Sequence, residues 1–286
     1  MRQHRIGSAT VGAIGLGEMP MSLEGRPDEA RSIATIHAGL EAGVTLIDTA
    51  DAYSKGGPDT GHGELLVAKA LASWDGDPDE VLVATKGGHY RPGDGTWKVN
   101  GRPEYLRAAA EASLRRLGVD AIGLYQYHRP DPAVPYEEAI GILKELLDLG
   151  KARMVGISNA SVDQIDTAVE ILGPGNLASV QNQFSLAFRS SEKELRHAGE
   201  VGAAFLPWSP LGGIGNAERV ASEHPAVVEI AKRRGVSAQQ VVLAWMLAKG
   251  EHVTPIPGSS RPETIKDSAA AADLELSGEE LARIDA

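Results

Sequence analysis

Short apolar runs alternate with longer segments whose apolar residues recur at helical spacing, and this alternation constrains the fold more than any other feature of the sequence. Eight strands are predicted, each too short to form a helix, at residues 13–16, 45–48, 81–85, 122–127, 154–158, 178–181, 203–208 and 253–256. Neighbouring parallel strands need a long crossover connection, usually a helix, so strands that alternate with helices are expected to pair in parallel. The eight strand-helix units therefore predict an α/β fold, a closed parallel (β/α)8 TIM barrel.

The ends of several helices can be predicted independently of this periodicity. Ser161 with Gln164, and Ser237 with Gln240, fit the capping-box pattern, in which side chains satisfy unpaired backbone amides at a helix start. Gly150 follows an apolar helical stripe and suits a left-handed C-terminal cap. These signals support the alternation of strands and helices.

Residues 1–286 are expected to form a single domain. The segments rich in glycine and proline each follow a predicted strand, at residues 54–63, 87–101 and 210–215. In a barrel, the loops after the strands meet at one face, where active sites lie, so we interpret these segments as site loops and not as linkers. Residues 1–12 are predicted to form a short N-terminal hairpin, with Gly7 and Ser8 as its turn, at the opposite end of the barrel.

Charge and composition narrow the class of partner. Lys and Arg total 28 against 39 Asp and Glu, and the resulting net charge of −11 disfavours nucleic acid and an anionic membrane while favouring a small-molecule ligand. The absence of cysteine excludes a disulfide framework, a thiolate metal site, an iron-sulfur cluster and a cysteine nucleophile. The amino terminus lacks the apolar stretch of a signal peptide, and no apolar run approaches the roughly 18 residues of a membrane span, so a cytoplasmic protein is expected.

Four ionisable residues of four types lie at the ends of three successive predicted strands. Asp48 ends the second strand and Tyr53 follows it, Lys86 ends the third strand, and His128 follows the fourth. Such a set suits proton transfer to a carbonyl oxygen: the phenol is the acid, the cation lowers its pKa from about 10, the carboxylate holds the cation, and the imidazole orients the oxygen. Each residue alone has a structural alternative, such as a helix cap for Asp48 or a solvated surface position for Lys86, but their co-occurrence favours a site.

Several sequence blocks carry a resemblance to a known family. They are GLG at 15–17, GVTLIDTADAY at 43–53, ATKGG at 84–88, YQYHRPDP at 125–132 and VGISN at 155–159, followed by QNQFS, PWSPLGG and PIPGSSRPETIKDS. In these blocks and their order, the chain resembles the aldo-keto reductase family from about Gly15 to the carboxyl terminus. The resemblance implies a (β/α)8 barrel, which agrees with the strand count.

The resemblance also implies a reaction, the transfer of a hydride between a reduced nicotinamide and the carbon of an aldehyde or ketone. Tyr53 would be the general acid, Lys86 and Asp48 would tune its proton affinity, and His128 would orient the substrate carbonyl. The cofactor would supply the reducing power and the protein the geometry and electrostatics.

The implied cofactor is NADP(H), with NAD(H) as the alternative. Ser158, Asn159 and Gln181 would bind the nicotinamide carboxamide, and Trp208 would stack on the ring. The later blocks supply the other implied cofactor-binding residues: Ser209, Leu211, Gly213, Gly258, Ser259, Ser260, Arg261, Asp267 and Ser268.

The expected site for the 2′-phosphate of NADP departs from the family pattern. The lysine that many relatives carry after PIP is Gly258 here, and the arginine a few residues later is Thr264. Arg261 can replace that charge at the start of the last barrel helix, where unpaired amides favour an anion, so NADPH is favoured over NADH. Asp267 and Ser268 stand where relatives place an acidic residue and an asparagine against the adenine.

A small-molecule aldehyde or ketone is expected above Tyr53 and His128. The candidate walls of its pocket are Glu18, Met19, Tyr90, Trp97 and Arg129, with an ordinary surface acid as the alternative for Glu18.

Two alternatives belong to other classes of protein. A nicotinamide-binding regulatory or partner subunit would keep the barrel and the cofactor site but turn over slowly, and the intact set of four ionisable residues argues against it. A metal-dependent hydrolase would use His62, His89 and His128 as ligands, but no His-x-His pair or His-Glu cluster has ligand spacing, so no metal is expected.

Overall fold

The fold is built around a seven-stranded parallel sheet whose strand order is β11-β10-β9-β8-β5-β4-β3. A computed structural model of the protein describes residues 1–213, 215–217, 219 and 223–286. The strands of the sheet are β3 (Leu16–Gly17), β4 (Leu46–Asp48), β5 (Leu82–Gly87), β8 (Ile122–Tyr127), β9 (Ala152–Ser158), β10 (Leu177–Gln181) and β11 (Ala204–Phe205). Strands that follow one another in the chain are neighbours in this sheet, as successive strand-helix units require.

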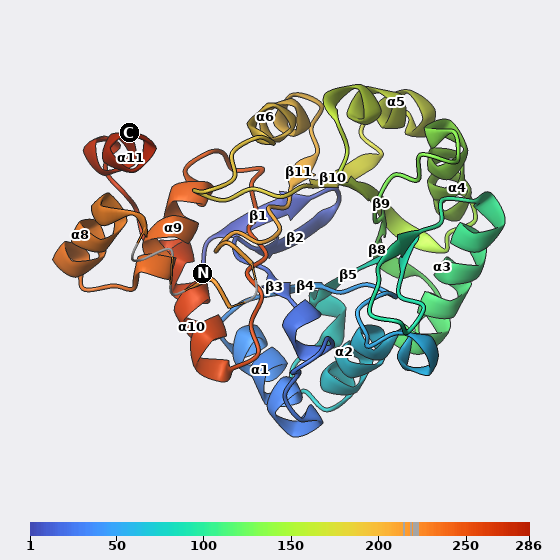
Figure 1. Cartoon of the computed structure of the whole chain (residues 1–286), viewed down its shortest axis with the longest axis horizontal. Helices are drawn as coiled ribbons and strands as arrows, with labels where there is room; N and C mark the ends of the chain where they lie inside the picture. Colours follow the sequence, from blue (N-terminus) through green and yellow to red (C-terminus); the bar gives the residue numbers. More distant parts are fainter. Residues whose placement is uncertain (214, 218, 220–222) are drawn as a thin grey trace.

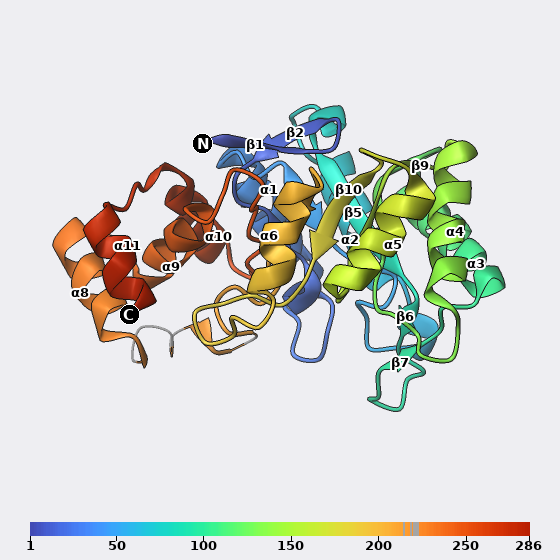
Figure 2. The same ribbon diagram turned by 90° about the horizontal axis from the view of Figure 1, so that it is seen from above.

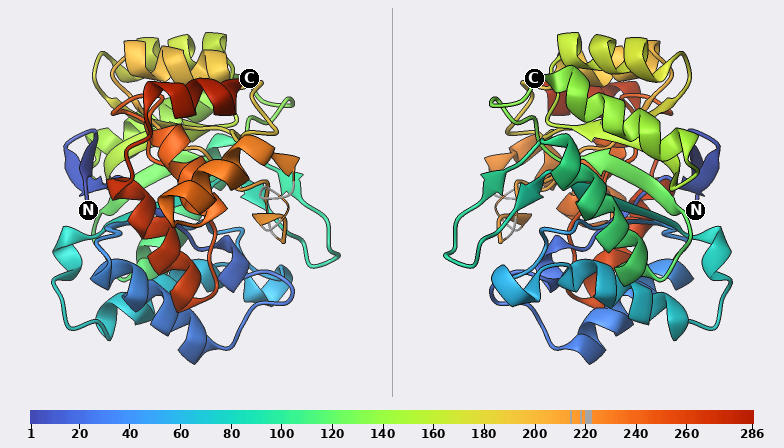
Figure 3. Two further views of the ribbon diagram at one scale, coloured as in Figure 1. Left: turned by 90° about the vertical axis from the view of Figure 1, so that its left-hand side faces the viewer. Right: turned by 90° about the vertical axis from the view of Figure 1, so that its right-hand side faces the viewer.

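Helices surround the sheet on its outer side (Figure 1). They are α1 (Glu29–Glu41), α2 (His62–Ala72), α3 (Pro103–Leu117), α4 (Tyr136–Asp148), α5 (Val162–Leu172), α6 (Glu192–Glu200), α8 (Pro225–Arg234), α9 (Ala238–Leu247), α10 (Pro262–Ala270) and α11 (Gly278–Asp285). Helices α8, α9 and α11 lie together at one side of the molecule, next to the carboxyl terminus (Figures 1 and 3).

The predicted eighth strand is the main correction to the expected barrel. Residues 253–256 form no strand. Two isolated parallel bridges, Phe205 to Val253 and Gly17 to Gly258, and single backbone hydrogen bonds join residues 253–258 to the two edge strands of the sheet. Pro255 and Pro257 interrupt a regular ladder here, because proline has no backbone N–H to donate. The α/β fold is therefore confirmed with seven parallel strands, and a closed eight-stranded sheet is not.

Two further strands are shorter than predicted. The N–H group of Ala13 donates to Arg2, and pairing with β4 starts only where Leu16 lies opposite Ile47, so β3 begins at Leu16. Pro207 has no such donor, and β11 ends at Phe205. By contrast, β8 has the predicted bounds, because its ladder with both neighbouring strands is regular.

An antiparallel hairpin of β1 (Gln3–Ile6) and β2 (Ala9–Gly12) precedes the parallel sheet. Gly7 in its turn has a φ of +53°, a left-handed conformation that favours glycine, and a Cβ there would come within 2.8 Å of the Met154 sulfur and displace that side chain. Figure 2 shows this hairpin at one end of the sheet and a second hairpin, β6 (His89–Tyr90) with β7 (Lys98–Val99), at the other end. Loops that follow the strands lie at this second end.

The helix boundaries follow the capping signals closely. Ser161 and Gln164 form the complete predicted capping box at the start of α5. Ser237 caps α9 by accepting from the Gln240 backbone, but the Gln240 side chain donates to Asp267, so only half of the second predicted box forms. Gly150 follows α4 with a φ of +67°, as predicted.

Helix α11 is attached to α8 through a buried carboxylate. Glu280 is 2% exposed and accepts hydrogen bonds from Arg233 and from both Nε and Nη2 of Arg234. Its Oε2 also accepts from the Ser277 backbone in a capping box. These donors hold the pKa of Glu280 well below its usual range, the Arg234 hydrogen bonds contributing most.

Replacing Glu280 with glutamine is expected to lower the free energy of unfolding by about 1–3 kcal/mol at pH 7, because the arginines lose a charged acceptor but are partly solvated. A lowered folded-state pKa contributes stability that is complete above the unfolded value and is lost as the pH falls toward the folded value. The difference between wild type and Glu280→Gln should therefore shrink below about pH 4.3. Urea denaturation across pH tests this, with the exposed neighbour Glu279→Gln as control; equal losses in the two variants would contradict it.

Candidate active site

Lys86 is at the centre of a buried hydrogen-bonded cluster at the carboxyl ends of β4 and β5. Its ammonium donates to Asp48 Oδ2 at 2.6 Å, to the Thr49 carbonyl at 2.8 Å and to the Tyr53 hydroxyl at 3.2 Å. The Lys86 side chain is fully buried, and these three acceptors match the three protons of an ammonium group. Lys86 is thus held as a cation in contact with the Tyr53 hydroxyl.

Opposing effects act on the Tyr53 phenol. Burial raises its pKa, the charge and hydrogen bond of Lys86 lower it, and Asp48 raises it again, so that the net pKa lies above the usual value. In the same environment burial lowers the pKa of the Lys86 ammonium, but the Asp48 charge and the hydrogen bonds to Asp48 and Tyr53 outweigh this effect, so that the net pKa is raised. Tyr53 therefore keeps its proton at neutral pH, while Lys86 is placed to stabilise the phenolate that forms when the proton leaves.

His128 follows β8 and lies edge-on to Tyr53, with 5.7 Å between the ring centroids. The histidine is buried, and its Nδ1 has no hydrogen-bond partner in the protein. Burial, followed by the nearby Lys86 charge, lowers the pKa of His128 well below its usual value. The imidazole is therefore neutral and can hydrogen-bond to a neutral oxygen in the space next to Tyr53.

The second oxygen of Asp48 is also bound. Asp48 Oδ1 accepts from Gln181 Nε2 at 2.7 Å and from Gln126 Nε2 at 3.4 Å. Ser179 in turn donates to Gln126 Oε1 at 3.1 Å. A layer of amide side chains from β8 and β10 thus fixes the carboxylate that holds Lys86.

Ser158 and Asn159 extend this network at the end of β9. Ser158 Oγ donates to the Gln181 carbonyl at 2.7 Å, and Asn159 Nδ2 donates at 3.0 Å to both Ser158 Oγ and the His128 carbonyl. Asn159 has a φ of +57°, in the left-handed region that asparagine tolerates better than most residues. Arg129 reaches Asn159 Oδ1 at 3.4 Å and links the network to the rim of the site.

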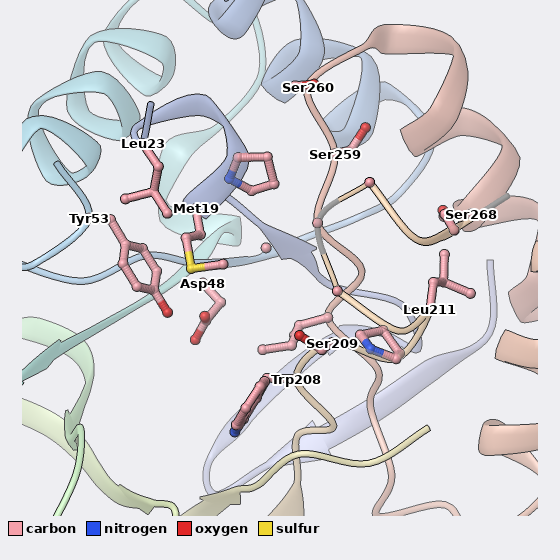
Figure 4. A pocket seen from close by; sticks show the side chains of 18 of the residues that line it. Met19, Leu23, Asp48, Tyr53, Trp208, Ser209, Leu211, Ser259, Ser260 and Ser268 are labelled. Atoms are coloured by element: carbon pink, nitrogen blue, oxygen red, sulfur yellow. The ribbon is translucent and has the colours of Figure 1, made fainter. Parts of the chain in front are cut away.

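A cavity of about 1260 Å³ lies above the buried cluster. Asp48, Tyr53 and His128 line it, and Lys86 lies behind them. All the residues predicted to bind the cofactor line the same cavity: Ser158, Asn159, Gln181, Trp208, Ser209, Leu211, Gly213, Gly258, Ser259, Ser260, Arg261, Asp267 and Ser268. Figure 4 shows Tyr53 and Asp48 on one side of this space, Trp208 and Ser209 on another, and Ser259, Ser260 and Ser268 farther along it.

The segment after Trp208 bends sharply along the cavity. Ser209 has a φ of +52°, and Gly212 and Gly213 have φ values of +83° and +94°. These left-handed positions keep the chain tightly curved, and the glycines present backbone without side chains. Ile214, part of the predicted glycine-rich loop, lies outside the described residues.

Arg261 stands at the start of α10 as its N-cap residue. Its own side chain makes no capping bond there, and it lines the cavity with Ser259 and Ser260. Asp267 accepts from Ser237 at 2.7 Å and from Gln240 at 2.6 Å, which ties α10 to the start of α9. This end of the cavity thus combines a guanidinium with the N-terminus of a helix, both of which favour an anion.

The predicted substrate walls are only partly brought together. Met19, Trp97 and Arg129 line the cavity, but Tyr90 does not, because its ring packs against Tyr105 at 5.9 Å. His89 lines the cavity in its place, since successive side chains of a strand point to opposite faces. The Trp97 ring stacks on His89 with 4.8 Å between centroids.

Glu18 is not a wall of the pocket either. Its side chain is fully buried and accepts hydrogen bonds from Ser22 and Thr49, whereas Gly17 and Met19 on either side line the cavity. Glu18 has helical backbone angles, φ −79° and ψ −21°, at the start of the 3-10 turn Met19–Met21, and its side chain turns into the interior, which sequence position alone does not reveal.

The three histidines of the hydrolase alternative do not form one cluster. His89 and His128 are in edge contact at 4.9 Å, but His62 lies on α2 and its Nδ1 is 2.8 Å from the Ser22 hydroxyl. Within the part of the chain that the structure describes, no three His, Cys, Asp or Glu side chains are placed to hold a metal ion. None of the helices described there is both long and apolar enough to cross a membrane.

Comparisons with known proteins agree with this geometry. A profile described as the aldo/keto reductase family matches residues 13–286. The chain belongs to the aldo/keto reductase family. The resemblance seen in the sequence blocks is thereby confirmed, and the protein is an oxidoreductase.

Individual members of this aldo/keto reductase family match along nearly the whole chain. An uncharacterized oxidoreductase of Schizosaccharomyces pombe is 34% identical over 98% of this chain and 88% of its own length. A probable aldo-keto reductase of Glycine max is 33% identical over 98% of this chain and 84% of its own length. The crystal structure of an aldo-keto reductase from Klebsiella pneumoniae in complex with NADPH is 30% identical, with a TM-score of 0.82 over 100% of this chain and 95% of that one.

Three contributors to this aldo/keto reductase site escaped the sequence reasoning. Gln126 lies two residues before His128 in β8, and Thr49 directly follows Asp48, so strand alternation and adjacency were available signals. His89 is predicted from the sequence only as a metal ligand of the hydrolase alternative, although its place after the third strand also suits a pocket wall.

Proposed function

We propose that this protein transfers a hydride between NADPH and the carbonyl carbon of a small aldehyde or ketone, reversibly, with Tyr53 exchanging a proton with the oxygen. The observation that carries the proposal is the contact of Lys86 Nζ with both Asp48 and the Tyr53 hydroxyl, under a cavity that His128 also lines. A phenol in contact with a buried ammonium is suited to giving up its proton only when negative charge develops beside it.

The residues along the cavity fit a nicotinamide dinucleotide. Ser158, Asn159 and Gln181 place amide and hydroxyl groups around one end, and Trp208 lies beside them with a buried Nε1 that has no partner. The left-handed backbone after Trp208 suits a pyrophosphate, and Arg261 at the helix start suits a further phosphate. When bound, the nicotinamide would supply the hydride.

The protein's own groups perform the remaining work. Tyr53 and neutral His128 would donate hydrogen bonds to the substrate oxygen, and these bonds would hold the carbonyl carbon inside the cavity. During reduction the proton would pass from the Tyr53 hydroxyl to that oxygen, and the ammonium of Lys86 would stabilise the phenolate left behind. Asp48 keeps Lys86 charged and in place.

NADPH is the favoured cofactor, with NADH as the alternative. Arg261 offers a bidentate donor for a 2′-phosphate at the N-terminus of α10, and Ser259 and Ser260 line the same end of the cavity. The Klebsiella pneumoniae relative in complex with NADPH supports the same preference.

One domain spanning residues 1–286 is also inferred, supported by a family match over residues 13–286.

The function is tested by following NADPH absorbance with a panel of aliphatic, aromatic and sugar aldehydes and ketones. NADPH consumption that depends on both protein and carbonyl is the expected result. Tight NADPH binding without turnover of any carbonyl would instead favour the regulatory-subunit alternative, because that class keeps the cofactor site and lacks the chemistry.

Arg261→Ala is expected to raise the KM for NADPH about 10- to 100-fold, since a charge-assisted phosphate contact contributes about 1.5–3 kcal/mol. The KM for NADH should stay within about twofold, because NADH carries no 2′-phosphate. Arg102→Ala is a matched control: Arg102 is also an exposed N-cap arginine followed by proline, at the start of α3, and lies outside the cavity lining. An unchanged ratio of the two KM values in Arg261→Ala would refute the assignment.

A further inference from the structure

Glu18 is a buried carboxyl beside the cluster of Asp48, Lys86 and Tyr53, and the steps described above do not use it. The side chain is fully buried, although it follows the cavity-lining Gly17. Glu18 Oε2 accepts from Thr49 Oγ1 at 3.0 Å, and Oε1 contacts the Ser22 hydroxyl. A fully buried carboxyl without an arginine or lysine hydrogen bond is costly to keep ionised, which suggests a role beyond packing.

One residue separates Glu18 from Lys86. Thr49 donates to Glu18 through its hydroxyl and accepts from Lys86 Nζ through its carbonyl, at 2.8 Å. A change at the Glu18 carboxyl therefore acts directly on the segment that holds the ammonium next to Tyr53.

A second link leads from Glu18 outward. The Ser22 hydroxyl that contacts Glu18 lies 2.8 Å from Nδ1 of His62, which is partly exposed at the start of α2. Carboxyl, hydroxyl and imidazole form a continuous hydrogen-bonded chain from the interior toward solvent. Each of the three groups can both donate and accept a proton, as a proton path requires.

Helix α2 is fitted closely to this carboxyl. A Cβ on Gly63 would lie 2.4 Å from Glu18 Oε2 and 2.6 Å from Thr49 Oγ1, so only glycine leaves room for the two groups at this position. The titratable, charged and polar groups that face Glu18 or its link to solvent come from several neighbouring elements. They are Ser22, Asp48, Thr49, Tyr53, His62 and Lys86 around Glu18 and its hydrogen-bonded chain, with Arg26, Glu29, Asp59 and Lys69 near His62.

Burial raises the pKa of Glu18 to about 7, against the hydrogen bonds of Ser22 and Thr49 and the charge of Lys86, which lower it. The carboxyl thus changes its charge near neutral pH. Ionised Glu18 raises the pKa of Tyr53, because a negative charge nearby opposes formation of the phenolate. The two groups are therefore electrostatically coupled.

We propose that Glu18 is a positioning residue that acts through Thr49 and Lys86 on the proton transfer by Tyr53, and that it exchanges its own proton with solvent through Ser22 and His62. In the neutral form the carboxyl donates to the Ser22 hydroxyl, which donates to His62 Nδ1. On ionisation the carboxyl proton passes to Ser22, the Ser22 proton passes to Nδ1, and the imidazole releases one proton from its other nitrogen to water. The inference rests on the role proposed above for Tyr53.

The proposal predicts a characteristic pH dependence. In the wild-type protein, kcat for carbonyl reduction should fall between about pH 6 and 8 as Glu18 ionises, because Tyr53 becomes a weaker acid. It should fall again at alkaline pH as Tyr53 loses its proton. Glu18→Gln should remove the near-neutral step and lower the apparent pKa of the alkaline limb by about half a unit to one unit, because the amide carries no charge. Ser22→Ala should instead move the near-neutral step upward, since the Ser22 hydrogen bond holds the pKa of Glu18 down.

A readout without turnover separates this proposal from the proposed function. The ultraviolet absorbance of phenolate, taken as the difference between each protein and its Tyr53→Phe counterpart, reports the ionisation of Tyr53 in the free protein. Glu18→Gln should shift this titration downward, whereas Glu170→Gln, an exposed carboxylate on α5, should leave both it and the kinetic profile unchanged.

Each outcome decides one question. A shifted Tyr53 titration without reduction of any carbonyl would sink the proposed function and keep the coupling between Glu18 and Tyr53. Reduction of carbonyls with the same pH profile and Tyr53 titration in Glu18→Gln and Glu170→Gln would overturn the role of Glu18. If Glu18→Gln does not fold, Ser22→Ala decides: an unmoved near-neutral step in that variant overturns the proposal.

Discussion

Tyr53→Phe is expected to lower kcat for carbonyl reduction by about 10²- to 10⁴-fold, while the affinity for NADPH stays within about threefold. The substitution removes only the hydroxyl that Lys86 contacts at 3.2 Å and leaves the ring that packs edge-on against His128. The developing alkoxide therefore loses its proton donor, which lowers kcat. The residues that line the rest of the cavity are unchanged, so the affinity for NADPH is kept. Steady-state NADPH oxidation and fluorescence titration of the cofactor measure the two quantities.

Tyr136→Phe is the matched control for this variant. The Tyr136 hydroxyl is buried, has no hydrogen-bond partner and lies outside the cavity lining, so Tyr136→Phe tests the loss of a buried phenolic hydroxyl away from the site. It should change kcat by less than about twofold. If Tyr53→Phe and Tyr136→Phe had the same kcat, Tyr53 would not be the acid.

Asp48→Asn is expected to lower the free energy of unfolding by about 3–5 kcal/mol and to abolish most of the reductase activity. Asp48 accepts from three donors, Lys86, Gln126 and Gln181, and an asparagine has one acceptor oxygen and an NH₂ group that must face one of those donors. The buried ammonium of Lys86 loses its counter-charge, so its pKa falls and it no longer stabilises a phenolate on Tyr53. Urea denaturation at pH 7 gives the stability change.

An exposed lysine-aspartate pair provides the control. Lys144 and Asp148 are one helical turn apart on α4, and their side chains are 47% and 63% exposed. Asp148→Asn should cost no more than about 0.5 kcal/mol, because solvent screens an exposed pair. A loss for Asp48→Asn as small as for Asp148→Asn would show that burial adds nothing to the Lys86–Asp48 pair.

Much of the fold was predictable because its determinants are local. The run at 122–127 has the composition of a buried strand, a property of neighbouring residues, and it forms β8 with the predicted bounds. The Ser161 and Gln164 capping box formed because both of its partners lie within one helical turn. The apolar residues of 253–256 predict a strand, but Pro255 within it and Pro257 after it have no backbone N–H to donate, so no regular ladder forms.

The candidate site was predictable to the level of which residues stand at strand ends. Asp48, Lys86 and His128 come together because the carboxyl ends of neighbouring parallel strands open into one space. The roles assigned to them stay predictions that the variants above test. Tyr90 and Glu18 were wrong as pocket walls. Tyr90 lies on a strand, where a shift of one residue reverses the side-chain direction, and Glu18 lies at the start of a 3-10 turn that buries its side chain.

The sequence by itself thus determined the α/β class, the family and the set of ionisable groups, because periodicity, capping and contiguous motifs are properties of neighbouring residues. Only the tertiary structure decided that three acceptors surround the Lys86 ammonium, that His89 replaces Tyr90 at the cavity, and that Glu18 is connected to Lys86 through Thr49. These relations join residues that are distant in the chain, and burial and distance, which set their pKa values, exist only once the strands have assembled.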